Sequence, residues 1–299
     1  MAGPILRIGD RTITVDGTLV MGVVNASPDS FSDGGKYTTL EDRLKLADEL
    51  VAEGADILDV GGQSGITGVP EVEADEEIRR VVPVVAGIHE RHPDVLISVD
   101  TYKPPVVEAS IEAGASIVND VSGLLYPDVA RICASNGAAL VIMHTAAKPK
   151  ERLVDPHHYG DVVEDVHRFL AEKLDVATSL GVPQDAVILD PGPDFAKTPA
   201  QTVDIVRRLD RFRSFGRPIL LALSRKDFIG AILLKPPRQR LAGTMAAIAH
   251  VAAAGGNIVR VHDVAATKDV LAVIDVLAGR ADVAADYELP MSLRREALD

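Results

Sequence analysis

Hydrophobic residues along the chain form short runs that alternate with longer stretches of helical periodicity. The short runs are rich in Val, Ile and Leu and have the length of strands. They cover residues 19–25, 56–60, 95–100, 116–119, 139–143, 187–190, 218–223 and 257–261. Runs that are apolar at consecutive positions are typical of strands buried on both faces, as in parallel sheets.

The stretches between these runs carry apolar residues at spacings of three and four, which predicts amphipathic helices. Helices are expected over residues 40–52, 73–90, 106–113, 162–180 and 241–254. Several helical stretches are followed by glycine just before the next strand, as at Gly54, Gly114, Gly137 and Gly181, and glycine tolerates the left-handed turn that closes a helix. About eight strand–helix units in succession predict a parallel (β/α)8 barrel.

The two ends of the chain fall outside this repeat. Residues 5–15 have the pattern of a β-hairpin that turns at Gly9 and Asp10, placed to close the bottom of the barrel, and residues beyond 283 resemble a tail. No low-complexity linker interrupts the sequence. We therefore expect one barrel domain over residues 1–299.

The composition of the chain limits the classes of molecule that it is expected to bind. Hydrophobic residues make up 47% of the 299 positions and aromatic ones only 4%, so aliphatic side chains must fill the core. The formal net charge of −13 disfavours binding to nucleic acid or to anionic membranes, because the overall field repels polyanions. An anionic substrate would therefore need a local basic pocket.

The cysteine count and the length of the apolar runs indicate the cellular compartment in which the protein is expected. The single cysteine, Cys133, rules out an internal disulfide and lies in a helical pattern where a small buried side chain is usual. No run approaches the ~20 apolar residues of a membrane span, and the first residues lack a signal-peptide core. We expect a cytoplasmic protein that does not bind membranes.

Polar residues recur where the predicted strands end. Active sites of such barrels lie at the carboxyl ends of the strands, in the loops that follow. The polar and glycine positions there are Asn25, Gly61, Gly62, Asp100, Asn119, Asp120, His144, Asp190, Ser224, Arg225, Lys226, Arg260 and His262. Each alone could be a helix cap or a turn residue, but their common position on one rim predicts an active site.

These side chains suit a flat heterocycle joined to a phosphate. Asp100, Asn119 and Asp190 can pair with a ring edge rich in N–H and C=O groups, and Lys226 supplies positive charge nearby. Phosphate sites in such barrels often follow the seventh and eighth strands. The candidates in those loops are Ser224, Arg225, Arg260 and His262. The pattern therefore predicts a heterocycle carrying a phosphate ester or pyrophosphate.

Residues 21–35, Met-Gly-Val-Val-Asn-Ala-Ser-Pro-Asp-Ser-Phe-Ser-Asp-Gly-Gly, resemble the first signature of the dihydropteroate synthases. Similar motifs follow in order at residues 59–62, 97–101, 117–123, 188–192, 195–197, 224–226 and 260–263. The resemblance implies transfer of a pterin-methyl group from its pyrophosphate ester to the amine of p-aminobenzoate, with release of pyrophosphate. It also implies assistance by Mg²⁺ and a homodimer.

The resemblance also implies roles for individual residues. Asp100, Lys226 and Asn25 would act in catalysis, and Asn25 would contact the Mg²⁺ ion. Arg260 and His262 would hold the pyrophosphate. The residues implied to bind the pterin are Asp100, Asn119, Asp190, Lys226 and Arg260, with Met143 and Phe195 along its faces.

Three positions depart from the family pattern. After the second strand the family reads Gly-Gly-Glu-Ser-(Ser or Thr)-Arg-Pro-Gly, whereas residues 61–68 read Gly-Gly-Gln-Ser-Gly-Ile-Thr-Gly, so the loop arginine is missing. Asp227 replaces a residue, commonly Ser or Arg, that would meet the benzoate carboxylate, and two carboxylates repel. Asp194 stands where glycine is more frequent, and its effect does not follow from the sequence.

These departures leave alternatives beside a dihydropteroate synthase. Asn25, Asp33, Arg260 and His262 favour pyrophosphate chemistry, whereas Asp227 and the missing arginine favour a divergent paralogue with another acceptor, or a silent pterin-binding protein. A pterin-dependent methyltransferase shares the barrel plan, but the intact first loop is typical of the synthases. Observed release of pyrophosphate would eliminate the silent alternative.

Overall fold

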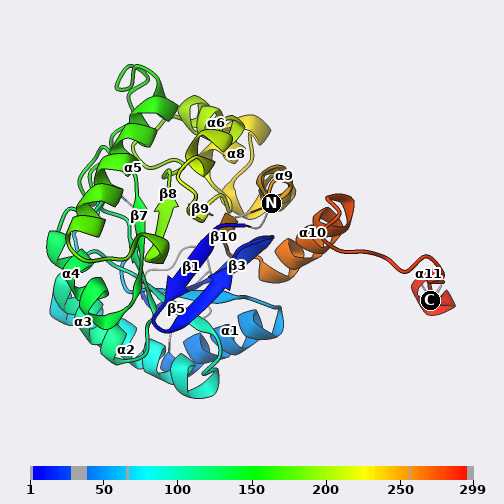
Figure 1. Ribbon diagram of the computed structural model, residues 1–299, viewed down its shortest axis with the longest axis horizontal. Coiled ribbons are helices and arrows are strands. Elements are labelled where there is room, and N and C mark those ends of the chain that lie inside the picture. Colours follow the sequence, from blue (N-terminus) through cyan, green and yellow to red (C-terminus); the bar gives the residue numbers. More distant parts are fainter. Residues whose placement is uncertain (1–2, 28–38, 65–66, 256, 295–299) are drawn as a thin grey trace.

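The computed structural model describes residues 3–27, 39–64, 67–255 and 257–294. Parallel strands close into a barrel in the order β10-β3-β4-β5-β6-β7-β8-β9 (Figure 1). The strands are β3 (Thr18–Asn25), β4 (Ile57–Gly61), β5 (Leu96–Asp100), β6 (Ile117–Asp120), β7 (Ala139–Met143), β8 (Val187–Asp190), β9 (Ile219–Leu221) and β10 (Asn257–Val261). The predicted (β/α)8 barrel is confirmed, with strand limits within one residue except that the seventh strand is shorter than 218–223.

Helices surround the barrel (Figure 1). They are α1 (Leu40–Ala52), α2 (Ala74–Arg91), α3 (Pro104–Glu112), α4 (Pro127–Asn136), α5 (Val162–Ser179), α6 (Pro199–Arg207), α7 (Asp210–Arg213), α8 (Asp227–Leu233), α9 (Leu241–Ala252), α10 (Val264–Leu277) and α11 (Met291–Arg294), with 3₁₀ turns η1 (Gln184–Ala186) and η2 (Pro237–Gln239). Gly54, Gly114, Gly137 and Gly181 all have positive φ angles. The glycine signals therefore marked real helix ends.

The N-terminal hairpin closes one end of the barrel. Strands β1 (Ile5–Ile8) and β2 (Arg11–Thr14) pair in antiparallel fashion across Gly9 and Asp10, as predicted. Leu6 and Ile8 are buried in one apolar cluster with barrel residues such as Met21 and Ile188. A second, larger cluster fills the space between strands and helices. Because the hairpin covers the amino ends of the strands, the polar residues gather at the opposite mouth.

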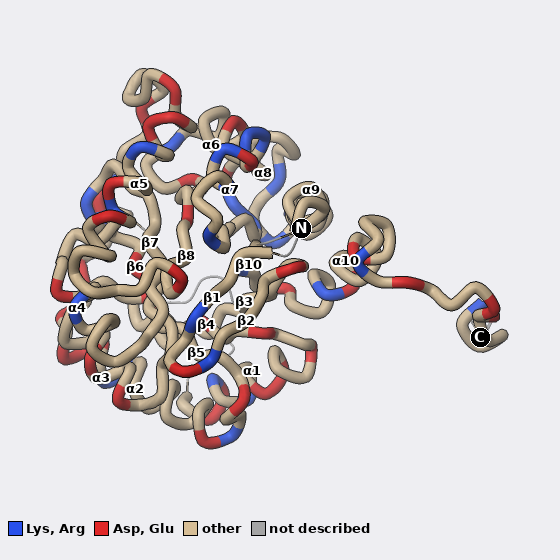
Figure 2. Tube along the Cα trace, viewed as in Figure 1, with Lys and Arg blue, Asp and Glu red and all other residues tan. Residues whose placement is uncertain are grey.

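The outer surface carries charges of both signs, distributed over the helices (Figure 2). After α10 the chain leaves the barrel, and α11 lies away from it (Figure 1). Residues 281–294 are exposed. Within the described ranges, no helix combines the length and the apolar character needed to cross a membrane.

Candidate active site at the barrel mouth

A half-buried guanidinium lies at the centre of the mouth. Arg260, from β10, donates from Nε to Asp59 Oδ2 at 2.6 Å and from Nη2 to Asp100 Oδ2 at 2.9 Å. Asp59 also accepts from Ser98 Oγ at 2.6 Å and from Asn119 Nδ2 at 3.3 Å. Side chains from β4, β5, β6 and β10 therefore meet in one polar cluster inside the barrel.

The cluster places two carboxylates around one cation. Burial raises the pKa of Asp100 to about 7; Arg260 opposes the rise and Asp59 adds to it. Burial lowers the pKa of Arg260, but Asp59 and Asp100 offset this, and its pKa is raised. With both carboxylates ionised the cluster has an excess negative charge, which suits a ligand rich in N–H donors.

Two further acceptors face the same interior. Among the described residues, Asn119 Oδ1 is buried and has no hydrogen-bond partner. Asp190, at the end of β8, accepts from the Gly192 amide at 2.7 Å through Oδ1, and burial raises its pKa to about 6. A buried acceptor without a partner costs ~1–3 kcal/mol. A ligand N–H at Asn119 would recover this energy.

Lys226 and Phe195 form one wall of the mouth. Lys226 Nζ lies 4.2 Å from the centroid of the Phe195 ring and donates to the Pro193 carbonyl at 3.1 Å. Burial lowers the pKa of Lys226, against the attraction of Asp194 and Asp190. Met143, at the end of β7, is 1% exposed, so its contact with a ligand would require a shift of its surroundings.

The loop that carries Phe195 is held in an unusual shape. Asp194 and Ala196 both have positive φ angles, 62° and 51°, which cost energy in residues other than glycine. Lys197 stabilises the loop through hydrogen bonds. Its Nζ donates to the carbonyls of Gly192 and Phe195 at 2.9 Å and lies 2.9 Å from His144 Nδ1. Burial lowers the pKa of Lys197 to about 7.

The predicted phosphate residues are brought together only in part. Ser224 Oγ lies 3.0 Å from His262 Nδ1. Arg225 turns to Asp263 instead, with Nη2 at 2.8 Å from its Oδ1 and 3.0 Å from its Oδ2. Since Arg260 is shared between Asp59 and Asp100, neither arginine presents an uncompensated charge to a phosphate.

The structure explains Asp194. Its Oδ2 accepts from the amides of Asp227 at 2.6 Å and Phe228 at 3.2 Å, at the start of α8, and its Oδ1 accepts from Thr202 Oγ1 at 2.8 Å. Asp194 thereby joins the β8 loop to α6 and α8. The Asp227 side chain is 85% exposed and lies 3.1 Å from Arg240 Nη1.

Some residues of the polar cluster had no predicted role, and some predicted residues lie outside the described part of the chain. Asp59 and Ser98 were within matched motifs but had no assigned role; the only signal was a polar residue inside an otherwise apolar strand. Asn25 ends β3 at the mouth and is half-buried. Residues 28–38, which include Asp33, and residues 65–66 lie outside the described residues.

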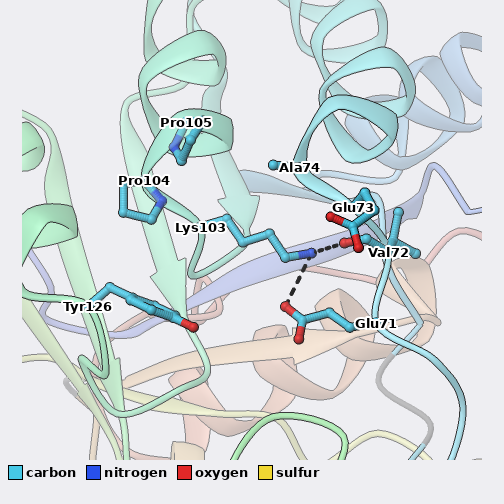
Figure 3. A pocket seen from close by; sticks show the side chains of 8 residues that line it. All are labelled: Glu71, Val72, Glu73, Ala74, Lys103, Pro104, Pro105 and Tyr126. Carbon is cyan, nitrogen blue, oxygen red and sulfur yellow. Dashed lines mark hydrogen bonds and ion pairs between the residues drawn. The ribbon is translucent and has the colours of Figure 1, made fainter.

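A separate pocket of about 330 Å³ lies beside the mouth, between the loop before α2 and the start of α3 (Figure 3). Within it, Lys103 Nζ donates to the carbonyl of Val72 and lies 3.5 Å from Glu71 Oε1, and it bonds to buried Glu77 at 2.7 Å. The lining residues are Glu71, Val72, Glu73, Ala74, Lys103, Pro104, Pro105 and Tyr126. No residue predicted to bind substrate lines this pocket.

Comparison with known proteins places this mouth in a family. A model of the pterin binding enzymes matches residues 21–262. The dihydropteroate synthase of Streptococcus pyogenes serotype M3 is 41% identical over 275 residues, which cover 91% of this chain and all of the relative. Xanthomonas albilineans dihydropteroate synthase with 4-aminobenzoic acid has a TM-score of 0.84 and 40% identity, over 92% of this chain and 98% of that one.

A second structure of the Xanthomonas albilineans enzyme, in complex with 7,8-dihydropteroate, has a TM-score of 0.81 and the same coverage of this chain, 92%. The similarity extends over the whole barrel, and the identity of about 40% is far above the level at which only a fold is shared. The motifs and the comparisons agree, and the chain belongs to the dihydropteroate synthases.

Proposed function

We propose that this chain joins 6-hydroxymethyl-7,8-dihydropterin pyrophosphate to p-aminobenzoate and releases pyrophosphate. The observation that carries the proposal is the buried set of acceptors at the mouth, above all Asn119 Oδ1, together with the family. A pterin presents adjacent N–H and C=O groups along one edge. Asp100, Asn119 and Asp190 would pair with that edge, and Phe195 and Met143 would flank the ring.

The reaction needs no enzyme nucleophile. The bond between the exocyclic carbon and the pyrophosphate oxygen breaks, and the oxygen keeps the electron pair. The arylamine nitrogen bonds to that carbon and loses a proton to water or to the departing pyrophosphate. Asp100 would stabilise positive charge developing on the carbon, and Lys226 would fix the ring. His262 would hold the leaving pyrophosphate together with Arg260, which would have to exchange its bond to Asp100 for one to the pyrophosphate.

Magnesium fits the donors at the mouth. Asn25 offers an amide oxygen at the end of β3, and Mg²⁺ is commonly held by one or two side chains, substrate phosphates and water. The described residues contain no group of three or more His, Cys, Asp or Glu side chains that could hold a metal, so substrate oxygens would complete the set. When bound, the ion would neutralise charge on pyrophosphate.

The identity of the amine that accepts the pterin-methyl group has an alternative to p-aminobenzoate. Asp227 and the missing loop arginine favour a paralogue that uses another amine or is silent. In the structure, however, Asp227 points to solvent and pairs with Arg240. Because this pairing reduces the negative charge that an incoming benzoate would meet, we favour p-aminobenzoate.

Pyrophosphate release tests the whole proposal. Purified chain with the pterin pyrophosphate and Mg²⁺ should release pyrophosphate only when p-aminobenzoate is added. Lys226→Met should lower kcat/KM about 100-fold or more, because a half-buried cation beside the ring is lost. Lys235→Met, on the exposed link after α8, should behave as wild type. Pterin binding without release would favour the silent alternative.

The raised pKa of Asp190 predicts how pterin binding depends on pH. The ionised carboxylate is the better acceptor, so the contribution of Asp190 to the affinity should fall about tenfold for each pH unit below about 6, in addition to the decrease caused by Asp100, whose pKa is about 7. Asp190→Asn should bind pterin about 10- to 100-fold more weakly at pH 8, and its deficit should shrink at low pH. Calorimetry from pH 5 to 8 measures both, with exposed Asp175→Asn as the control. A deficit constant with pH would contradict the assignment.

Asp227→Ser tests the acceptor site. Removal of the carboxylate should lower KM for p-aminobenzoate by about fivefold, equivalent to ~1 kcal/mol, and leave KM for uncharged 4-aminobenzamide unchanged. Steady-state kinetics with both acceptors gives the comparison, and Asp175→Ser serves as the control. An equal change for the two amines would show that charge at Asp227 does not matter to the acceptor.

We also propose a homodimer in the cytoplasm. Exposed apolar side chains gather on neighbouring α8, α9 and α10, a feature of interfaces; they are Ile232, Leu234, Leu241, Val273 and Leu277. Cys133, a free buried thiol, suits a reducing compartment.

Sedimentation should give a mass twice that of the monomer for the wild type. Leu277→Glu should shift the measured mass toward that of the monomer. Val154→Glu, exposed elsewhere, should not; a monomeric wild type would refute the dimer.

A further inference from the structure

A second groove lies on the outside of the barrel, between α6 and α8, and has a volume of about 290 Å³. Its walls are mostly apolar, and of the described residues that line it none is predicted to bind substrate. Ile232 is exposed, and so are Leu234 and Leu241, which follow it along the chain. The apolar residues that line the groove are Pro199, Ala200, Val203, Phe228, Ala231 and Ile232. An apolar groove that continues into exposed apolar side chains is a feature of protein interfaces.

The surroundings of this groove carry more positive than negative charge. Arg207, at the end of α6, lines the groove together with Asp204, and Lys235 and Arg238 lie on the exposed link that follows α8. Figure 2 shows Lys and Arg in blue close to both helices. Within the described ranges, these three cations are in no ion pair, so their charges are available to a partner. The groove therefore suits an acidic segment that carries apolar side chains.

The acidic tail, residues 281–294 after α10, has this character. All of its side chains are exposed. It keeps a turn of its own, because the Tyr287 amide donates to the Ala284 carbonyl at 3.0 Å. Its acids are Asp282, Asp286 and Glu288, and its exposed apolar side chains include Tyr287, Leu289 and Met291. A segment that leaves such side chains in water is stabilised when a surface covers them.

The acidic tail begins where we place the second copy of the chain. Leu277, in the last turn of α10, belongs to the exposed apolar surface that we assign to the dimer. Directly after α10 the chain runs outward, away from its own barrel (Figure 1). Within the barrel, α9 packs against both α10 and α8 and so lies between the start of the tail and the groove of the same subunit. The tail is therefore better placed to reach the groove of a partner subunit.

We propose that the acidic tail of each subunit docks in the groove between α6 and α8 of a second copy of this chain. The inference rests on the proposed homodimer. Tyr287 and Leu289 would cover the apolar walls, and Asp286 and Glu288 would lie beside the cations at the rim of the groove. Exchange of identical segments between two copies gives a closed, symmetric contact. The apolar side chains would supply most of the affinity, and the charges would fix which surfaces meet.

Two charge-reversed variants test the contact. The groove variant carries Arg207→Glu and Arg238→Glu, and the tail variant carries Asp286→Lys and Glu288→Lys. Each variant alone brings like charges together, so its dimer should dissociate about tenfold more readily than that of the wild type. Sedimentation at several protein concentrations measures the dissociation constant. The matched control, Lys148→Glu with Arg152→Glu, reverses two exposed cations elsewhere and should behave as wild type.

An equal mixture of the groove variant and the tail variant separates exchange between subunits from docking within one subunit. In a mixed dimer each tail meets a groove of opposite charge, so the mixture should dimerise within about threefold of the wild type. A tail that folds back onto its own groove would stay mismatched in both variants, and mixing would restore nothing. Because the changed residues are exposed, all variants should keep the melting temperature of the wild type.

The outcomes distinguish this inference from the proposals on which it rests. Dimers that charge reversal does not weaken, or a mixture that does not recover, would overturn the docking of the tail and leave the homodimer standing. A monomeric wild type would refute the homodimer and the docking together. Since sedimentation needs no turnover, a chain that releases no pyrophosphate would refute the proposed reaction and still leave the tail tested.

Discussion

The sharing of Arg260 between Asp59 and Asp100 is the constraint on which the mouth depends. Taking a charge out of water costs several kcal/mol, and this applies in full to Asp59, whereas Asp100 and Arg260 keep 21% and 22% of their side-chain surface exposed. Replacing such a buried group by apolar side chains is often neutral or stabilising. Asp59 is fully buried, and the hairpin closes the other end of the barrel, so water cannot reach the cluster from below. The cluster is therefore better explained by ligand binding than by stability.

The same constraint extends to the rest of the site. The bond from Asn119 Nδ2 to Asp59 fixes the amide so that Oδ1 remains without a partner among the described residues. Beside it, the strained loop at Asp194 and Ala196 persists because Lys197 braces it with buried hydrogen bonds. The polar groups and the strained loop already have these positions before a ligand binds. The free-energy cost of ordering the site around a flat ring is therefore lower.

The sequence predicted most of the fold because barrel strands are buried on both faces and read as continuous apolar runs. Strand ends were predicted to within one residue except at β9, and Gly54 and Gly114 marked helix ends. The direction of a side chain was harder to predict. Asp59 meets Ser98 because the register of β4 and β5 places the two residues opposite each other. Arg225 turns to Asp263, a choice that depends on how two distant loops meet.

The three departures from the family pattern form one consistent rearrangement of charge. Asp194 occupies the first amides of α8 with the chain's own carboxylate, and Asp227 is drawn outward to Arg240. The start of α8 is thus a poorer place for an acceptor carboxylate than in a chain with glycine and serine there. An acceptor with a carboxylate would then depend on positive charge from other loops of the mouth, and the sequence after β4 lacks the family's arginine.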